Sequence, residues 1–331
     1  MSQASAPSES RSVCVIEPER KGLLPDFREI WRYRELFWVL VMRDITARYK
    51  QTYLGLVWAV LVPLTQVLVF NVIFGLVGAR EKLVSSSVPF MVTAFCGNLA
   101  WQIFASGSAS AGSSIINASG MVKKVYFPRL LVPLSALGRA LVDCLIMLGI
   151  LVLLMAGYHM FGGCDFTPTW RLAFLPLFVG LAVLAALAVG VWLAALTARW
   201  RDLNFILPFL FQIGQYVSPV IYEGSIIPDR KRWVEWLERH HGAQWFEGHG
   251  MSFLFPWVEK LDPQVLSGIN PMAGIIEGFR WSLFSRQVES GPHPYQAPGL
   301  MMLVSTAVVL ATLFSGLRFF RKTERDFVDI L

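Results

Sequence analysis

The chain has 331 residues, of which 55% are hydrophobic and only 16% are charged. Soluble globular domains carry about 25% charged residues, so this composition excludes an ordinary soluble protein. The formal net charge of +6 comes from basic residues that flank apolar segments, which indicates membrane topology rather than nucleic-acid binding. We therefore predict an all-α polytopic membrane protein with no nucleic-acid partner.

The N-terminal region divides into a polar tail and an amphipathic segment. Residues 1–25 are rich in Ser, Pro and Glu and lack the apolar run of a signal peptide, so we expect a disordered cytosolic tail. In residues 26–53, apolar side chains recur at helical spacing opposite several arginines, which predicts an amphipathic helix in the cytosolic membrane interface. Its apolar stripe comprises Ile30, Phe37, Val41 and Ile45.

Six apolar segments follow. Five of them contain no Asp, Glu, Lys or Arg, and each reaches the roughly 20 residues that cross a bilayer core. The other segment, 130–158, is apolar apart from Arg139 and Asp143, which are close enough on one helix face to pair with each other. We predict six transmembrane helices per subunit, five within residues 54–222 and the sixth at 299–318. The uncharged stretches are 54–79, 83–122, 172–198, 203–222 and 290–317.

The basic residues predict the orientation. They concentrate before the first segment, in the second and fourth loops, and in the tail at 319–331. Because short cytosolic loops carry an excess of Lys and Arg, both termini are expected in the cytosol and the long fifth loop, 223–298, in the periplasm. The expected location is a bacterial inner membrane.

The second cytosolic loop, 117–129, is short and basic and reads NASGMVKKVYFPR. Pro128 would end a small helix there. With the amphipathic helix, this loop would form a second rigid cytosolic element on which a partner could press. Ordinary positive-inside charge explains its two lysines equally well, whereas the adjacent aromatic pair is harder to explain that way. The candidate coupling residues are Arg28, Arg32, Lys123, Lys124, Tyr126 and Phe127.

Two predicted spans carry aromatic stripes. At helical spacing, these side chains share one narrow face of each span. Aromatic rings can stack on the apolar faces of sugars, and glutamine amides can bond to hydroxyl groups, so the chemistry suits a sliding glycan. Lipid contact or helix packing is the alternative explanation. The candidate path residues are Gln66, Phe70 and Phe74 on the first span, and Phe205, Phe209, Gln212 and Tyr216 on the fifth.

The fifth loop is too long for a plain connection. Residues 229–266 are polar with four tryptophans, which predicts a small periplasmic insertion. Residues 269–284 are apolar and begin with Asn-Pro, but they are too short and too charged to span. A re-entrant or interfacial helix pair is expected there. The histidines His240, His241 and His249 lie among solvated residues without clustered cysteines, so no metal site is expected.

The chain shows no energy source of its own. It contains no GxxxxGK[ST] phosphate loop. Coupling to protons or sodium usually needs ionisable residues inside the membrane, and only Arg139 and Asp143 qualify. No Ser-His-Asp or paired-carboxylate arrangement stands inside a span, so no catalytic residue is assigned. We expect no cofactor in this chain and a separate motor subunit.

Five sequence runs, in order and at matching topological positions, resemble the membrane subunit of ABC-type O-antigen, capsule and teichoic-acid exporters. They are ARYKQTYLGLVWAVLVPL (47–64), NASGMVKKVYFPR (117–129), TARWRDL (197–203), INPMAGIIEGFRW (269–281) and FFRKTERDFVDIL (319–331). The resemblance covers the chain from about residue 26 to the end, apart from 229–266. That insertion is longer than the family leads us to expect.

The resemblance implies a homodimer of six-span subunits with two ATP-binding-cassette ATPase subunits, which use ATP and Mg, on the cytosolic side. It implies that the amphipathic helix contacts the ATPase and that the loop 117–129 supplies the coupling helix. Residues 269–284 would correspond to periplasmic gate helices, and the two aromatic stripes would line the path.

The expected function is therefore a channel-forming permease subunit that exports a lipid-linked polysaccharide, with O-antigen as the first expectation, from cytosol to periplasm. One alternative is an ATP-driven exporter of lipids or drugs, and another is a membrane-embedded glycosyl- or acyltransferase. The sequence leaves open the glycan composition, the lipid carrier, the choice among O-antigen, capsule and teichoic acid, and the role of the insertion. It also leaves open whether the ATPase has a carbohydrate-binding domain.

Overall fold

The computed structural model describes most of the chain. The described residues are 27–49, 55–79, 83–84, 88–161, 168–228, 230–239, 258, 260–289, 299–324 and 327. Within them all regular structure is helical, as the predicted all-α class requires. The predicted tail at 1–25 lies outside the described residues, as do His240, His241 and His249.

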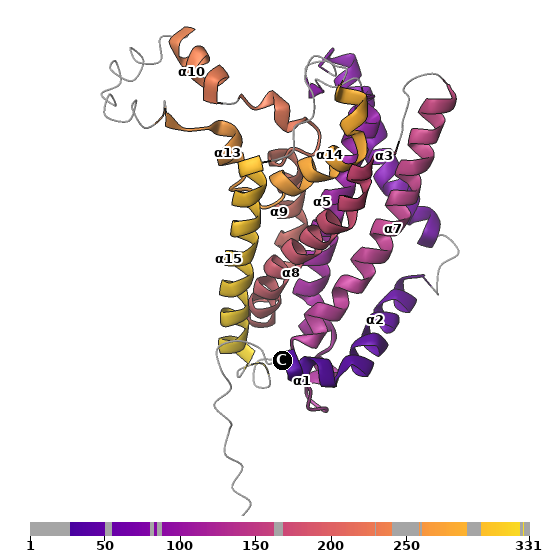
Figure 1. Cartoon of the computed structure of the whole chain (residues 1–331). Helices are drawn as coiled ribbons and strands as arrows, with labels where there is room; N and C mark the ends of the chain where they lie inside the picture. Colours follow the sequence, from indigo (N-terminus) through magenta and orange to yellow (C-terminus); the bar gives the residue numbers. More distant parts are fainter. Residues whose placement is uncertain are drawn as a thin grey trace, which may run out of the picture.

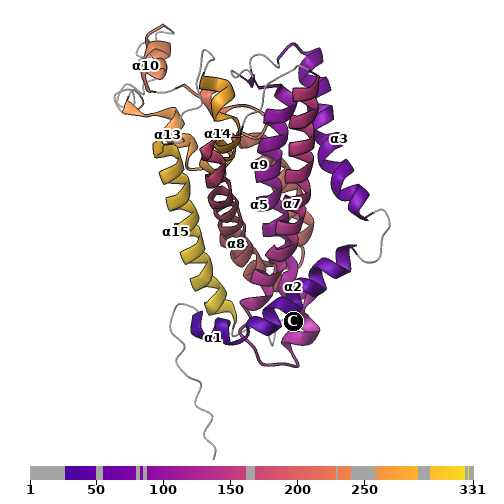
Figure 2. The same ribbon diagram turned by 45° about the vertical axis from the view of Figure 1, so that its right-hand side comes forward.

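Long helices run side by side in a bundle (Figure 1). In chain order the elements are α1 Phe27–Arg32, α2 Arg34–Tyr49, α3 Gly55–Leu76, α5 Phe90–Asn117, α6 Ser119–Val122, α7 Leu131–Met160, η1 Trp170–Phe174, α8 Leu175–Arg199, α9 Leu203–Val217, η2 Gly224–Ile226, α10 Arg230–Arg239, α13 Pro263–Ser267, α14 Ala273–Glu289 and α15 Gly299–Thr323. The bundle has an α2 end, with α1, α2 and the C-terminal part of α15, and an α14 end, with α10, α13 and α14 (Figures 1 and 2).

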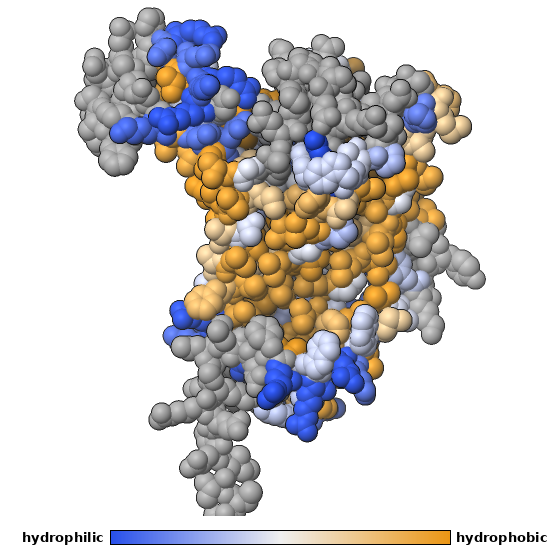
Figure 3. Space-filling view, viewed as in Figure 1, coloured by the Kyte–Doolittle hydropathy of each residue, from blue (hydrophilic) through white to orange (hydrophobic). Residues whose placement is uncertain are grey.

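The chain is a multi-pass membrane protein. Among the described residues, three helical segments are long and apolar enough to cross a membrane: Leu131–Met160, Trp170–Arg199 and Gly299–Thr323. The face in Figure 3 shows an apolar band between more polar ends. α3 is also apolar, α9 is apolar but only 15 residues long, and α5 has 28 residues with many Gly, Ala and Ser. The six-span topology remains a prediction.

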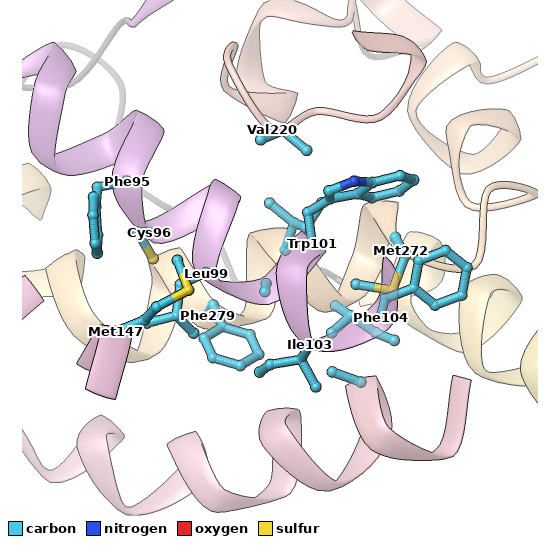
Figure 4. Packing of buried hydrophobic residues seen from close by; sticks show 14 of the residues in the cluster. Phe95, Cys96, Leu99, Trp101, Ile103, Phe104, Met147, Val220, Met272 and Phe279 are labelled. Atoms are coloured by element: carbon cyan, nitrogen blue, oxygen red, sulfur yellow. The ribbon is translucent and has the colours of Figure 1, made fainter. Parts of the chain in front are cut away.

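α5 forms the centre of the bundle and packs chiefly against α7 and α8. Small residues permit the close approach, as in many membrane helix pairs. A Cβ at Gly190 would lie 2.6 Å from the Cβ of Ala111, and one at Gly107 would lie 2.9 Å from the Cβ of Ala186. Thr197 adds a hydrogen bond to the carbonyl of Gly112 on α5, at 2.6 Å. Larger side chains near the α14 end complete the core (Figure 4).

The predicted amphipathic helix at 26–53 is two helices, because the chain breaks at Tyr33 between α1 and α2; residues 50–53 lie outside the description. Its apolar stripe faces the bundle, with Val41 buried against Gly138 of α7, where an added Cβ would meet Val41 Cγ1 at 2.6 Å. A second set of apolar residues is exposed and was not predicted. It comprises Trp31, Trp38, Val39 and Met42.

The expected pair between Arg139 and Asp143 is replaced by contacts to other helices. Asp143 forms an ion pair with Arg48 of α2 at 3.1 Å, and the hydroxyl of Tyr49 donates to the same carboxylate. Burial, followed by this hydrogen bond, raises the pKa of Tyr49 to about 12. Arg139 instead donates to Ser110 of α5. Asp143 therefore ties α2 to α7.

Candidate translocation path and coupling surface

α9 carries an open row of aromatic side chains. Phe205 is 77% exposed, Phe209 67% and Tyr216 52%, and Gln212 among them is also exposed. The buried side chains of α9 are Leu207, on the side opposite this row, and Gln215, on its flank. α9 contains no charged residue, so all four predicted path residues of this helix lie on one uncharged face.

The predicted stripe on α3 lies differently, because its rings are packed. Phe70 is only 8% exposed, and its ring meets Tyr216 edge-on with 6.0 Å between centroids. Phe74 lies 5.9 Å from the ring of Phe90 on α5. Helix packing, the alternative weighed for these stripes, thus describes Phe70 and Phe74. The two stripes meet at the Phe70–Tyr216 contact.

A chain of side-chain amides joins α3, α9 and α5. Gln66 Nε2 donates to Gln215 Oε1 at 2.9 Å, and Gln215 Nε2 donates to Asn98 Oδ1 at 3.0 Å. Both Gln215 and Asn98 are buried, and such bonds between membrane helices fix their relative positions. Sequence reasoning chose Gln212 and missed Gln215 and Asn98, since a uniformly apolar helix does not reveal which face is buried.

The segment predicted to hold a pair of gate helices, 269–284, contains a turn followed by one continuous helix, α14. The turn is held by two hydrogen-bonding side chains. Asn270 Nδ2 donates to Ser218 Oγ at 2.8 Å, and its Oδ1 accepts from the Met272 amide at 3.0 Å. Ser305 of α15 accepts from the Gly274 amide at 3.1 Å. The short α13, Pro263–Ser267, precedes the turn and begins within the predicted insertion 229–266.

A buried ion pair fixes α14 to the chain that follows α9. Arg280 Nη1 lies 2.7 Å from Glu277 Oε1, and the Arg280 side chain is fully buried. Arg280 also donates to the carbonyls of Tyr222 and Val220, each at 2.8 Å, while Glu277 accepts from the Gly224 amide at 2.8 Å. An isolated buried charge would be costly, and these bonds offset much of that cost.

Sequence reasoning did not assign Glu277 and Arg280 to a site. The available signal was an acidic and a basic residue three positions apart in an otherwise apolar run. Glycines allow the dense packing around them. A Cβ at Gly97 of α5 would overlap the Val220 carbonyl, and one at Gly278 would overlap the ring of Phe178 on α8.

At the α2 end, the loop 117–129 presents two different aromatic residues. Tyr126 is 74% exposed, whereas Phe127 is only 4% exposed. Lys123 and Lys124 are exposed beside Tyr126, as are Arg28 and Arg32 on α1. The small helix, α6, ends at Val122, so it stops well before Pro128, contrary to the prediction that Pro128 ends it.

Phe127 belongs to an apolar cluster that joins the loop 117–129 to the C-terminal tail. The cluster includes Phe320 and the fully buried Phe327, whose rings lie 5.4 Å apart. The Arg129 guanidinium lies 5.9 Å from the centre of the Phe327 ring and donates to the Glu324 carbonyl. Ile30 and Phe37 of the N-terminal helices pack against the same cluster. The sequence offered no signal for this tail contact.

The described residues include no group of three or more His, Cys, Asp or Glu placed to hold a metal ion. The site consists of three features of the helical bundle. α9 has an exposed face without charged residues, the start of α14 is held by hydrogen bonds at the α14 end, and the α2 end exposes basic residues. Such an arrangement can guide a large molecule and receive force, and it has the parts expected of a transport channel.

Comparisons with known proteins agree with this view. Residues 35–239, more than half of the chain, match the ABC-2 type transporter family. The chain is 30% identical over 202 residues to the O-antigen export system permease protein RfbA of Myxococcus xanthus, covering 61% of this chain and 74% of that protein. Two such proteins of Klebsiella pneumoniae are 28% and 25% identical, each match covering 60% of this chain and 73% of the relative. These matches confirm the predicted resemblance to ABC-type exporter permeases. They also confirm that this chain is the membrane permease and not the subunit that hydrolyses ATP. The chain belongs to the ABC-2 type transporter family.

Proposed function

We propose that two copies of this chain and two ATP-binding-cassette ATPase subunits form an exporter of lipid-linked polysaccharide, O-antigen in the first instance. Cargo would move from cytosol to periplasm across a bacterial inner membrane, with both termini in the cytosol. The observation that carries the proposal is the uncharged face of α9, where Phe205, Phe209, Gln212 and Tyr216 are exposed together. Three aromatic rings and a glutamine amide on one face would bind successive sugar units weakly, which would let a polysaccharide slide along the helix.

A second copy is needed to enclose this face. α3, which meets α9 at the Phe70–Tyr216 contact, exposes a further set of large apolar side chains. They include Trp58, Leu61, Val62, Leu68 and Val69. A partner subunit placed against α3 and α9 would cover this surface and leave the aromatic row lining a path. Six helices can barely surround an aqueous route, whereas twelve can.

The ATPase would bind at the α2 end and would itself use ATP and Mg. Tyr126 and the lysines Lys123 and Lys124 are exposed at this end, as are the arginines of α1. Force on this loop would reach the bundle through Phe127, which is buried in the cluster shared with α15 and the tail. The proposed coupling element is therefore the exposed loop tip together with its buried neighbour.

ATP hydrolysis by the purified complex tests the proposed cargo. Lipid-linked polysaccharide should stimulate hydrolysis, while phospholipids and hydrophobic drugs should not. Stimulation by phospholipids or drugs, without an effect of the lipid-linked glycan, would instead support a lipid or drug exporter. Formation of a new glycosyl or acyl linkage without ATP would indicate a membrane-embedded transferase.

A further inference from the structure

α10 projects sideways from the α14 end of the bundle. It packs on α13, which in turn packs on α15, and both ribbon views place it above the N-terminal end of α15, at the edge of the bundle away from α3 (Figures 1 and 2). α15 is one of the helices long and apolar enough to cross a membrane, and α10 stands beyond its N-terminal end. α10 therefore lies at the edge of the bundle, next to the lipid that would surround α15.

One side of α10 holds the helix in place. Leu237 is 4% exposed, and the indole nitrogen of Trp233 donates to the Val258 carbonyl at 3.0 Å. The rings of Trp233 and Trp236 are stacked with 5.3 Å between centroids and 6° between planes. Trp236 is nevertheless 48% exposed, so about half of this indole, which stacks on Trp233, faces the surroundings.

Basic residues flank the half-exposed Trp236. Arg232 and Arg239 lie one helical turn to either side of Trp236 on the same face of α10, and both are exposed. Arg239 also meets Glu235 at 3.5 Å, but the two side chains are 75% and 60% exposed, so the pair is weak. Over the whole helix, four basic and two acidic residues leave a net charge of +2.

We propose that α10 docks on the membrane surface at the α14 end, with Trp236 in the headgroup region and Arg232 and Arg239 on anionic lipid headgroups. Tryptophan is enriched at membrane–water interfaces, and basic side chains are attracted to anionic lipid surfaces. The inference rests on the position and surface of α10, and it is independent of the proposed cargo.

A polysaccharide is the other occupant that a tryptophan with flanking arginines could bind. The position of α10 favours lipid. The aromatic face of α9 adjoins α3 through the Phe70–Tyr216 contact, and α3 lies on the far side of the bundle from α15 (Figures 1 and 2). A chain that left along that face would emerge away from α10.

An environment-sensitive fluorophore at position 236 tests the docking in the full-length protein. The Trp236→Cys variant would be labelled in a background in which Cys14 and Cys164 are serine, because Cys96 and Cys144 are buried. The protein would be placed in nanodiscs of phosphatidylcholine alone or mixed with phosphatidylglycerol. We expect a blue-shifted label, quenched by headgroup-spin-labelled lipid, in the mixed discs.

Two double variants that each remove two positive charges from α10 then distinguish specific docking from a general attraction of the helix to anionic lipid. Arg232→Gln with Arg239→Gln should weaken the lipid-dependent signal by roughly tenfold or more, because each basic residue near an anionic surface strengthens binding about fivefold. Arg230→Gln with Lys231→Gln removes the same charge from other faces of the helix and should retain most of the signal. Size-exclusion chromatography would verify that both variants assemble normally.

Three results would overturn the proposal. The label could remain exposed to water in both lipid compositions, or the control pair could lose as much signal as the Arg232 and Arg239 pair. The label could also become buried only when a soluble acidic polysaccharide is added, which would assign α10 to the glycan instead.

Discussion

The adjacent aromatics Tyr126 and Phe127 allow force transmission to be separated from folding. Phe127 is 4% exposed and Tyr126 is 74% exposed. Truncating a buried phenylalanine to alanine typically costs about 3–5 kcal/mol, whereas a surface substitution usually changes stability by less than about 0.5 kcal/mol. Phe127→Ala should therefore destabilise the permease, while Tyr126→Ala should leave it stable but reduce ATP-driven export.

The two effects can be measured on the same preparations. Heating the detergent-purified permease and following the remaining monodisperse fraction by size-exclusion chromatography gives the thermal stability. ATP hydrolysis and export by the assembled complex then report coupling. Phe127→Leu serves as the matched control, because it keeps most of the buried apolar volume and should recover most of the lost stability.

The reasoning would be refuted in either of two ways. If Phe127→Ala were as stable to heat as the wild type, the cluster with Phe320 and Phe327 would not hold the loop. If Tyr126→Ala assembled with the ATPase and exported at the normal rate, the exposed loop tip would not carry the force.

Three further predictions concern the remaining parts of the molecule. Glu277→Gln should lower thermal stability markedly, since breaking a buried ion pair typically costs about 3–5 kcal/mol. The double variant Glu277→Gln with Arg280→Met should lose less thermal stability than the single variant. Wild-type thermal stability of Glu277→Gln would contradict the importance of the ion pair. The double variant Phe205→Ala and Phe209→Ala should assemble normally, because both rings are exposed, yet export slowly; normal export would point to lipid contact. A membrane-impermeant thiol reagent should label a cysteine on α10 in spheroplasts and one in the loop 117–129 only after permeabilisation, and the reverse pattern would invert the proposed orientation.

The helical class and the family could be predicted because they depend on local properties of the sequence. Long uncharged apolar runs predicted helices whose described bounds follow them closely, as for the run 172–198 and α8, Leu175–Arg199. The spacing of Phe205, Phe209 and Tyr216 predicted a shared face, since helical periodicity alone determines it.

What could not be predicted depends on contacts between distant segments. Asp143 lies one helical turn from Arg139 in sequence, yet it pairs with Arg48, because α2 folds back against α7. Gln215 and Gln212 lie on the same helix, and only the packing of α9 on its neighbours buries the first and exposes the second. Likewise, the contact of Phe327 with Arg129 joins residues that no periodic pattern connects.

Translocation in reconstituted vesicles tests the central claim most directly. Proteoliposomes that contain the permease and its ATPase would receive fluorescent lipid-linked polysaccharide on the ATPase side, and protection of the glycan from an added glycosidase would be followed after addition of ATP and Mg. Transfer of the glycan to the vesicle interior, dependent on ATP and slowed in the variant Phe205→Ala with Phe209→Ala, is the result expected. ATP-dependent transfer of ordinary phospholipid with no transfer of the glycan would contradict the account.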